Sequence, residues 1–116
     1  MEYDGTMLIT ERLDECRAFY TALLGVESDP GAGWARFALA DGSWIALHTP
    51  WRTGMTTSGG SQVMLLRVES LSDESARLAA AGVACSEPHE IPGGAVVTIC
   101  DPDDRMIQLI AYSAEG

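Results

Sequence analysis

The chain has 116 residues, of which 47% are hydrophobic and 21% charged. These values are typical of one globular domain and exclude a disordered chain. The 17 acidic residues outnumber the 7 basic ones and give a formal net charge of −10, which disfavours nucleic acids and anionic membranes as partners and favours a cationic ligand.

The sequence carries no signal for a membrane or for export. No apolar run approaches the roughly 18 residues of a transmembrane helix, and the first ten residues lack the basic start and apolar stretch of a signal peptide. The three cysteines, Cys16, Cys85 and Cys100, are odd in number and widely spaced, as expected of reduced thiols. We therefore predict a cytoplasmic protein.

The first half of the chain predicts one helix among four strands. An apolar stripe at helical spacing, which includes Cys16, Tyr20 and Leu23, predicts a helix over 13–24 that ends at Gly25. Apolar and alternating stretches predict strands on either side of it. These strands are Asp4–Glu11, Val26–Asp29, Trp34–Ala40 and Ser43–Thr49.

The second half repeats this order at an offset of 57 or 58 residues, which aligns Leu8 with Leu66 and Gly25 with Gly82. Ser72 is the expected N-cap of a helix over 72–81, and His89 is expected in a loop before the Gly93-Gly94 turn. The predicted strands of this half are Gln62–Glu69, Ala84–Glu87, Ala95–Cys100 and Arg105–Tyr112.

The repeat predicts an α+β fold of two βαβββ modules within a single domain, 1–116. The first module spans 1–51, a Gly/Ser/Thr-rich linker spans 52–61, and the second module spans 62–116. Each helix can cover one face of its own sheet, which leaves the other face open. We expect the two curved mixed sheets to enclose a cavity.

Two motifs in these modules resemble a known family. The helix segment Phe19-Tyr20-Thr-Ala-Leu-Leu-Gly25 is similar to the Phe-Tyr…Leu-Gly helix of the vicinal oxygen chelate superfamily, and Asp101-Pro-Asp-Asp-Arg-Met-Ile-Gln-Leu109 is similar to its Asp-Pro-Asp-Gly-Asn-x-Ile-Glu-Leu ending. That superfamily includes glyoxalase I, extradiol dioxygenases, fosfomycin-resistance enzymes and bleomycin-binding proteins. The resemblance spans nearly the whole chain and implies the paired-module fold, but it does not select one of these chemistries.

The resemblance also locates the positions at which metal-dependent members place His, Glu or Gln. They fall on Gly5, Ala46, Val63 and Gln108, of which the first three have no side-chain donor. A shift of register by one residue would bring in Asp4, and a shift by two would bring in His48. Because a divalent ion needs three or four converging ligands, we predict no metal site and no cofactor.

Alternation along the strands selects residues for the open faces, because side chains two positions apart share a face. Trp34, Trp44 and Arg36 are expected to line the cavity, where the tryptophans would stack against a flat ligand. The same rule adds polar and adaptable side chains, so the predicted ligand-binding set is Met7, Trp34, Arg36, Trp44, His48, Arg67, Met106, Gln108 and Tyr112.

Two hypotheses of different classes remain open. The first is a metal-free protein that binds and sequesters a small molecule, such as a cationic aromatic antibiotic, as in the bleomycin-resistance branch. The resemblance implies a homodimer. The alternative is a glyoxalase-like lyase, an isomerase or a dioxygenase-like enzyme, which would need a misassigned metal site or acid–base catalysis by Glu11, Glu69 or His48.

Overall fold

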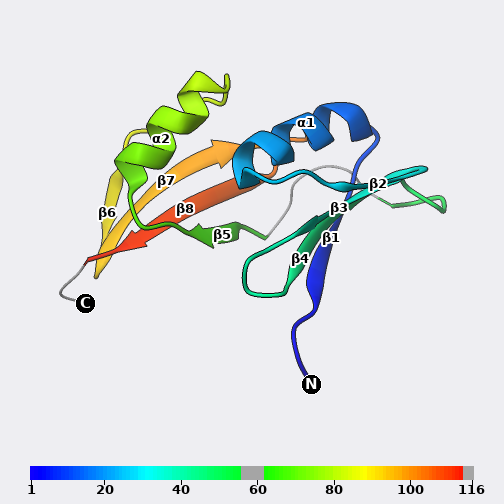
Figure 1. Cartoon of the computed structure of the whole chain (residues 1–116), viewed down its shortest axis with the longest axis horizontal. Coiled ribbons are helices and arrows are strands. Elements are labelled where there is room, and N and C mark those ends of the chain that lie inside the picture. Colours follow the sequence, from blue (N-terminus) through cyan, green and yellow to red (C-terminus); the bar gives the residue numbers. More distant parts are fainter. Residues whose placement is uncertain (56–61, 114–116) are drawn as a thin grey trace. The chain divides into compact units, whose positions relative to one another are not determined.

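The computed structural model describes residues 1–55 and 62–113, and it confirms the predicted α+β fold with two βαβββ halves (Figure 1). The chain divides into two compact units, Met1–Ser58 and Gly59–Gly116. Of the predicted linker 52–61, residues 56–61 lie outside the described part of the chain. No helix in the described part is long and apolar enough to cross a membrane.

The first unit is a mixed four-stranded sheet in the order β1-β4-β3-β2. Strand β1 runs parallel to β4, whereas β3 is antiparallel to both of its neighbours. A parallel pair needs a long crossover connection, and helix α1 with β2 and β3 provides it. The elements are β1 (Gly5–Ile9), α1 (Leu13–Leu24), β2 (Asp29–Gly31), β3 (Trp34–Ala38) and β4 (Trp44–His48).

Helix α1 covers one face of this sheet, as its apolar stripe predicts (Figure 1). Cys16 and Tyr20 are fully buried, and the Tyr20 ring lies 6.4 Å from the ring of Phe37 on β3. The helix ends at Gly25, whose φ of 71° is a left-handed conformation that glycine adopts without a Cβ clash. One face of the sheet is therefore core, and the other is left for another role.

The turn between β3 and β4 is closed by a side chain. Asp41 accepts hydrogen bonds from the backbone N–H of Ser43 at 3.0 Å and from its hydroxyl at 2.6 Å. Both bonds favour the charged form and lower the pKa of the Asp41 carboxyl below its ordinary value. The turn brings Trp44 opposite Ala38 and so sets the register of the β3–β4 pair.

The second unit repeats the topology in the order β5-β8-β7-β6, with β5 parallel to β8. Leu78 of helix α2 is fully buried, and α2 packs on β7 and β8. The elements are β5 (Met64–Arg67), α2 (Leu71–Ala80), β6 (His89–Ile91), β7 (Gly94–Cys100) and β8 (Met106–Tyr112).

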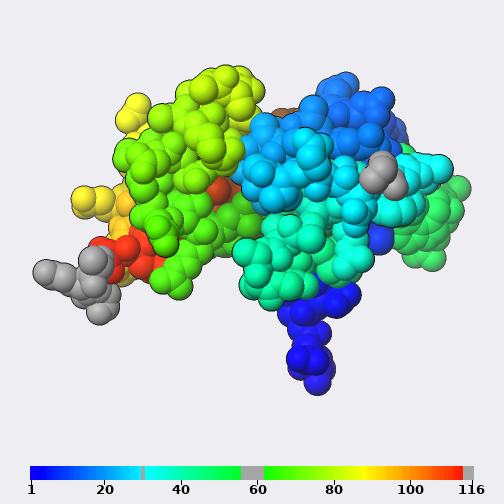
Figure 2. Space-filling model, in the orientation of Figure 1, coloured from blue at the N-terminus to red at the C-terminus, as the bar shows by residue number. Residues whose placement is uncertain are grey.

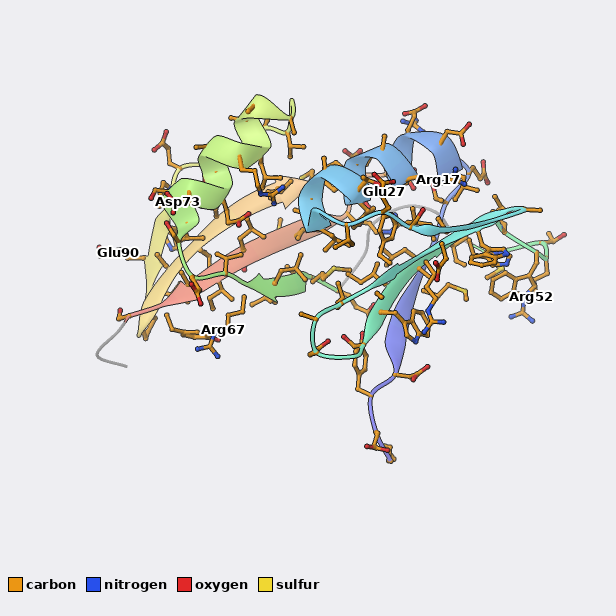
Figure 3. All side chains as sticks on the ribbon, viewed as in Figure 1. Arg17, Glu27, Arg52, Arg67, Asp73 and Glu90 are labelled. Carbon is orange, nitrogen blue, oxygen red and sulfur yellow. The ribbon has the colours of Figure 1, made fainter. Side chains whose placement is uncertain are left out.

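The prediction of Ser72 as the N-cap of the second helix is wrong. Helix α2 begins at Leu71, and Ser70 is the cap: its backbone is extended, and its hydroxyl accepts a hydrogen bond from the N–H of Asp73 at 3.2 Å. Both serines suit a cap by residue type, but the bond must reach the third residue into the helix, and only Ser70 has that spacing. Asp73 (Figure 3) and Glu74 then lie in the first turn, where the helix dipole favours them.

The predicted strand at Ala84–Glu87 is also wrong, and the one at Val26–Asp29 begins too early. Each second strand lies directly before its glycine turn, so β6 pairs Ile91 with Gly94 and places His89 in a strand, with its side chain exposed, rather than in a loop. The reason is that a tight hairpin turn fixes the register of the residues beside it. Residues 84–88 still follow β7, because the N–H of Ser86 donates to the carbonyl of Thr98 at 3.0 Å.

The assignment of the cap predicts a difference between two neighbouring serines. Ser70→Ala removes an N-cap hydrogen bond and should lower the free energy of unfolding by about 1 kcal/mol. Ser72→Ala is the matched control, because the exposed Ser72 hydroxyl contacts only the Ser70 hydroxyl among described side chains, and it should cost less than about 0.5 kcal/mol. Urea denaturation measures both, and a larger cost for Ser72→Ala would contradict the assignment.

Candidate functional site

The candidate site lies on the face of the first sheet opposite α1. The pairing places Trp34 opposite His48, Arg36 opposite Ala46, and Met7 opposite Ala46 on the other side. Residues that pair directly across strands point to the same face, so these side chains share the open face. On β3 the partition is complete, with Ala35 and Phe37 buried and Trp34 and Arg36 exposed.

These side chains surround a shallow hollow of about 220 Å³. Five of the nine residues in the predicted ligand-binding set line it: Met7, Trp34, Arg36, Trp44 and His48. Ala46 and Leu47 of β4 form its floor, and Asp4, which the parity argument missed, closes one end. Whether the hollow binds a ligand remains a prediction.

Trp44 is held in place from two sides. Its indole N–H donates to Oδ2 of Asp4 at 2.9 Å, across 40 residues of sequence. Its ring lies over Gly5, the residue opposite it on β1, where any Cβ would overlap the ring. Asp4 belongs to the N-terminal segment that projects from the unit in dark blue in Figure 2. The contact with Trp44 therefore anchors that segment to the rim of the hollow.

Trp34 repeats this arrangement at the other edge of the sheet. Its ring lies over Gly31, its partner on β2, and a Cβ at Gly31 would overlap the indole. Trp34 keeps 36% of its surface exposed, so the ring is available for contact. A glycine inside a strand is a sequence signal for close approach of another group, and that signal could have identified both pairs.

Arg36 lies between the two tryptophans along the hollow. Its guanidinium carbon is 5.3 Å from the centroid of the Trp44 ring, within range of a cation–π interaction. Asp29 lies directly opposite it on β2, yet Arg36 forms no ion pair or hydrogen bond with any described residue. The guanidinium thus leans over the indole on the β4 side and not toward the carboxylate on the β2 side.

His48 lies at the end of the hollow opposite Asp4. Its Nδ1 lies 2.6 Å from the carbonyl oxygen of Thr49, and because a carbonyl only accepts, Nδ1 carries the proton. The ring of Trp51, which is 58% exposed and does not line the hollow, meets the His48 ring edge-on at 4.8 Å.

The other four predicted site residues belong to the second unit. Arg67 lies on the face of its sheet away from α2, and its guanidinium carbon is 5.0 Å from the centroid of the Tyr112 ring (Figure 3). Gln108 donates from Nε2 to the hydroxyl of Thr98 at 3.4 Å, and Met106 is 44% exposed. The strand pairing places these residues on one open face of the second sheet.

The residues at the positions that the resemblance assigns to a metal do not fit a metal ion. Gly5 and Ala46 have no donor, and the space beside Gly5 is filled by the Trp44 ring. The alternative register fails on distance: Asp4 precedes β1 and His48 pairs with its last residue, so about 16 Å of strand separates them. Nor do any three His, Cys, Asp or Glu side chains within residues 1–55 and 62–113 form a cluster suited to a metal.

Comparisons with known proteins agree with this fold. The sequence profile of the Glyoxalase/Bleomycin resistance protein/Dioxygenase superfamily matches residues 3–109. No curated protein matches the chain in sequence.

Solved structures of similar fold cover nearly the whole chain. A glyoxalase/bleomycin resistance protein from Catenulispora acidiphila has a TM-score of 0.77 at 21% identity, covering 97% of this chain and 100% of its own. A protein from Agrobacterium tumefaciens reaches 0.81 at 26%, covering 98% and 99%. A mutant of the fosfomycin resistance protein of Listeria monocytogenes, in complex with Mn(II) and a dihydroxypropylphosphonic acid, reaches 0.74 at 20%, covering 98% and 92%.

The contact between Trp34 and Gly31 predicts a specific non-additivity. Gly31→Ala should lower the free energy of unfolding by about 1–3 kcal/mol, because the new methyl group overlaps the indole. In a Trp34→Ala background the same change should cost much less, since the three atoms nearest to a Cβ at Gly31 all belong to that side chain. Urea denaturation of the double-mutant cycle tests this, and additive costs would show that the ring does not lie over Gly31.

Proposed function

Because the chain belongs to the Glyoxalase/Bleomycin resistance protein/Dioxygenase superfamily, yet lacks side-chain donors at three of that superfamily's four metal positions, we propose that it binds a small planar molecule without a metal ion and sequesters it unchanged. The observation that carries the proposal is the hollow on the open face of the first sheet, where two tryptophans and an arginine gather around an apolar floor. The superfamily alone does not decide between binding and catalysis.

The composition of the hollow supports a flat, largely apolar ligand. Tryptophan offers a large rigid surface, and methionine adapts to an irregular shape, so Trp34 and Met7 suit contact with a ring system. Ligand sites are typically lined by apolar and aromatic groups with a few polar ones to fix orientation. Arg36 and His48 would supply that orientation here.

The small size of the hollow supports a second copy of the chain as a partner. Its volume of about 220 Å³ is below the roughly 300–1,000 Å³ of a typical ligand pocket. A homodimer that covers this face would add a second wall and bury Met7, which is 44% exposed. We expect sedimentation to give a mass of about twice 12.4 kDa, and a monomer that still binds ligand would contradict this arrangement.

An enzymatic role is the second candidate, and His48 is the residue that favours it. Its Nδ1 contact with Thr49 orients the ring, and a neutral ring with its proton on Nδ1 would accept a proton at Nε2. Glu11 and Glu69 are exposed, lie beyond the ends of β1 and β5, and do not line the hollow. Turnover that His48→Gln abolishes without loss of ligand affinity would favour the enzyme over the binding protein.

Binding can be tested with a neutral planar probe, naphthalene carboxamide. The wild-type chain should bind it, and Trp34→Ala should lower the affinity by about a few-fold to a hundredfold, the loss of 1–3 kcal/mol of contact. Trp51→Ala is the matched control, an exposed indole outside the lining, and should leave the affinity within about threefold. Calorimetric titration measures the affinities.

Two results would count against the proposal. The first is an unchanged affinity in Trp34→Ala, and the second is a stoichiometric metal ion in the purified protein that raises the melting temperature and is removed by a chelator. A large loss of stability in Trp44→Ala with no change in affinity would instead assign Trp44 to the scaffold and leave Trp34 as the indole that contacts the ligand.

A further inference from the structure

We infer that the hollow recognises a planar molecule that bears an anionic group, with Arg36 as the residue that binds the anion and Trp34 as the surface on which the ring lies. The inference rests on the proposed function and names the ligand class for that same site.

The Arg36 guanidinium has donors available for a ligand. It carries five N–H donors in a planar fork, and no described residue supplies a carboxylate or carbonyl acceptor for them. Two other arginines differ: Arg77 pairs with Glu74 at 2.8 Å, and Arg105, which precedes β8, pairs with Asp101 at 2.9 Å. Arg67 on β5 resembles Arg36, because it too has no carboxylate partner among the described residues. Arg36 is therefore a cation without an ion-pair partner among the described residues, and it lies in a hollow that a ligand can reach.

The orientation of that guanidinium comes from the Trp44 ring. A chain of contacts leads from Asp4 to the indole N–H of Trp44 at 2.9 Å, and from the Trp44 ring to the guanidinium carbon at 5.3 Å. Gly5 lets the indole lie close to β1. Because the ring is fixed at its edge and beneath, the cation that lies over it loses less freedom when it binds an anion.

The exposed ring of Trp34 lies close enough to Arg36 for one ligand to contact both. Trp34 and Arg36 are two residues apart on β3, so they share a face at a spacing of about 7 Å. An aromatic ring over Trp34 would then direct a substituent toward Arg36. Trp44 already has Arg36 over its ring, so Trp34 is the indole left for the ligand.

Negative charges in the chain oppose the binding of an anionic ligand beside Arg36. The chain as a whole carries −10, and Asp29 and Asp4 flank Arg36 on the neighbouring strand and at the rim. Yet the Asp4 carboxylate already accepts the Trp44 N–H, and Asp29 does not line the hollow. Salt screens the rest of the net charge beyond about 10 Å. Asp29 is close enough to oppose an anion, and direct hydrogen bonding by the planar guanidinium fork has to outweigh it.

The test uses three probes that share a naphthalene ring and differ in charge: the carboxylate, the neutral carboxamide and the cationic carboxamidine. Each is titrated into the isotope-labelled full chain, and backbone amide shifts report the dissociation constant and the strands affected. We expect shifts on β3 and β4 and a preference of about tenfold or more for the carboxylate over the carboxamide.

Two variants distinguish the specific effect of Arg36 from the general effect of losing one positive charge. Arg36→Gln should remove the preference for the carboxylate over the carboxamide, because the charged fork is lost. Arg67→Gln is the matched control: Arg67 also lies over an aromatic ring without a carboxylate partner among the described residues, but it does not line the hollow, so the preference should persist.

The outcomes distinguish the two proposals. Tighter binding of the carboxamidine, equal binding of all three probes, or a carboxylate preference that survives in Arg36→Gln would overturn the anion inference while binding itself stands. If no probe perturbs the amides of β1, β3 and β4, the proposed function fails with it.

Discussion

The packing of two indoles onto glycines of the edge strands is the contact on which the rest of the first sheet's open face depends. Trp44 lies over Gly5 of β1, and Trp34 lies over Gly31 of β2. With any larger residue at either glycine, the ring would have to move away from the sheet. The flat placement of the rings leaves room above the middle of the sheet, where Ala46 adds little volume, and the hollow is the result. Stability and a binding surface therefore come from the same contacts.

Alternation along the strands was enough to predict which face each β3 residue occupies. Phe37 packs against Tyr20 of α1, and Trp34 and Arg36 lie on the other side. The duplicated order of elements, with a glycine after each helix, was enough to predict the fold. Both features depend on local periodicity, which a single sequence displays directly.

A single sequence does not indicate features that depend on strand register or on contacts between distant residues. The bond from Trp44 to Asp4 joins residues 40 positions apart, and no local pattern indicates it. The cap of α2 was misassigned because Ser70 and Ser72 are chemically alike, and only the position of the first helical turn separates them. Strand β6 was placed too early because the hairpin turn, and not the apolar content, sets where the pairing begins.

The position of Gly5 links the packing of the sheet to the chemistry available to it. In metal-dependent relatives the resemblance places a ligand there, and a ligand needs a side chain. Here a side chain at that position would overlap both the Trp44 ring and the backbone carbonyl oxygen of Trp44, so the sheet as it stands has no room for a donor at this point. The indole in turn accepts the Arg36 cation over its face. In place of a metal ligand at this position, the chain has an indole that carries an organic cation over its ring, and a guanidinium attracts anionic groups.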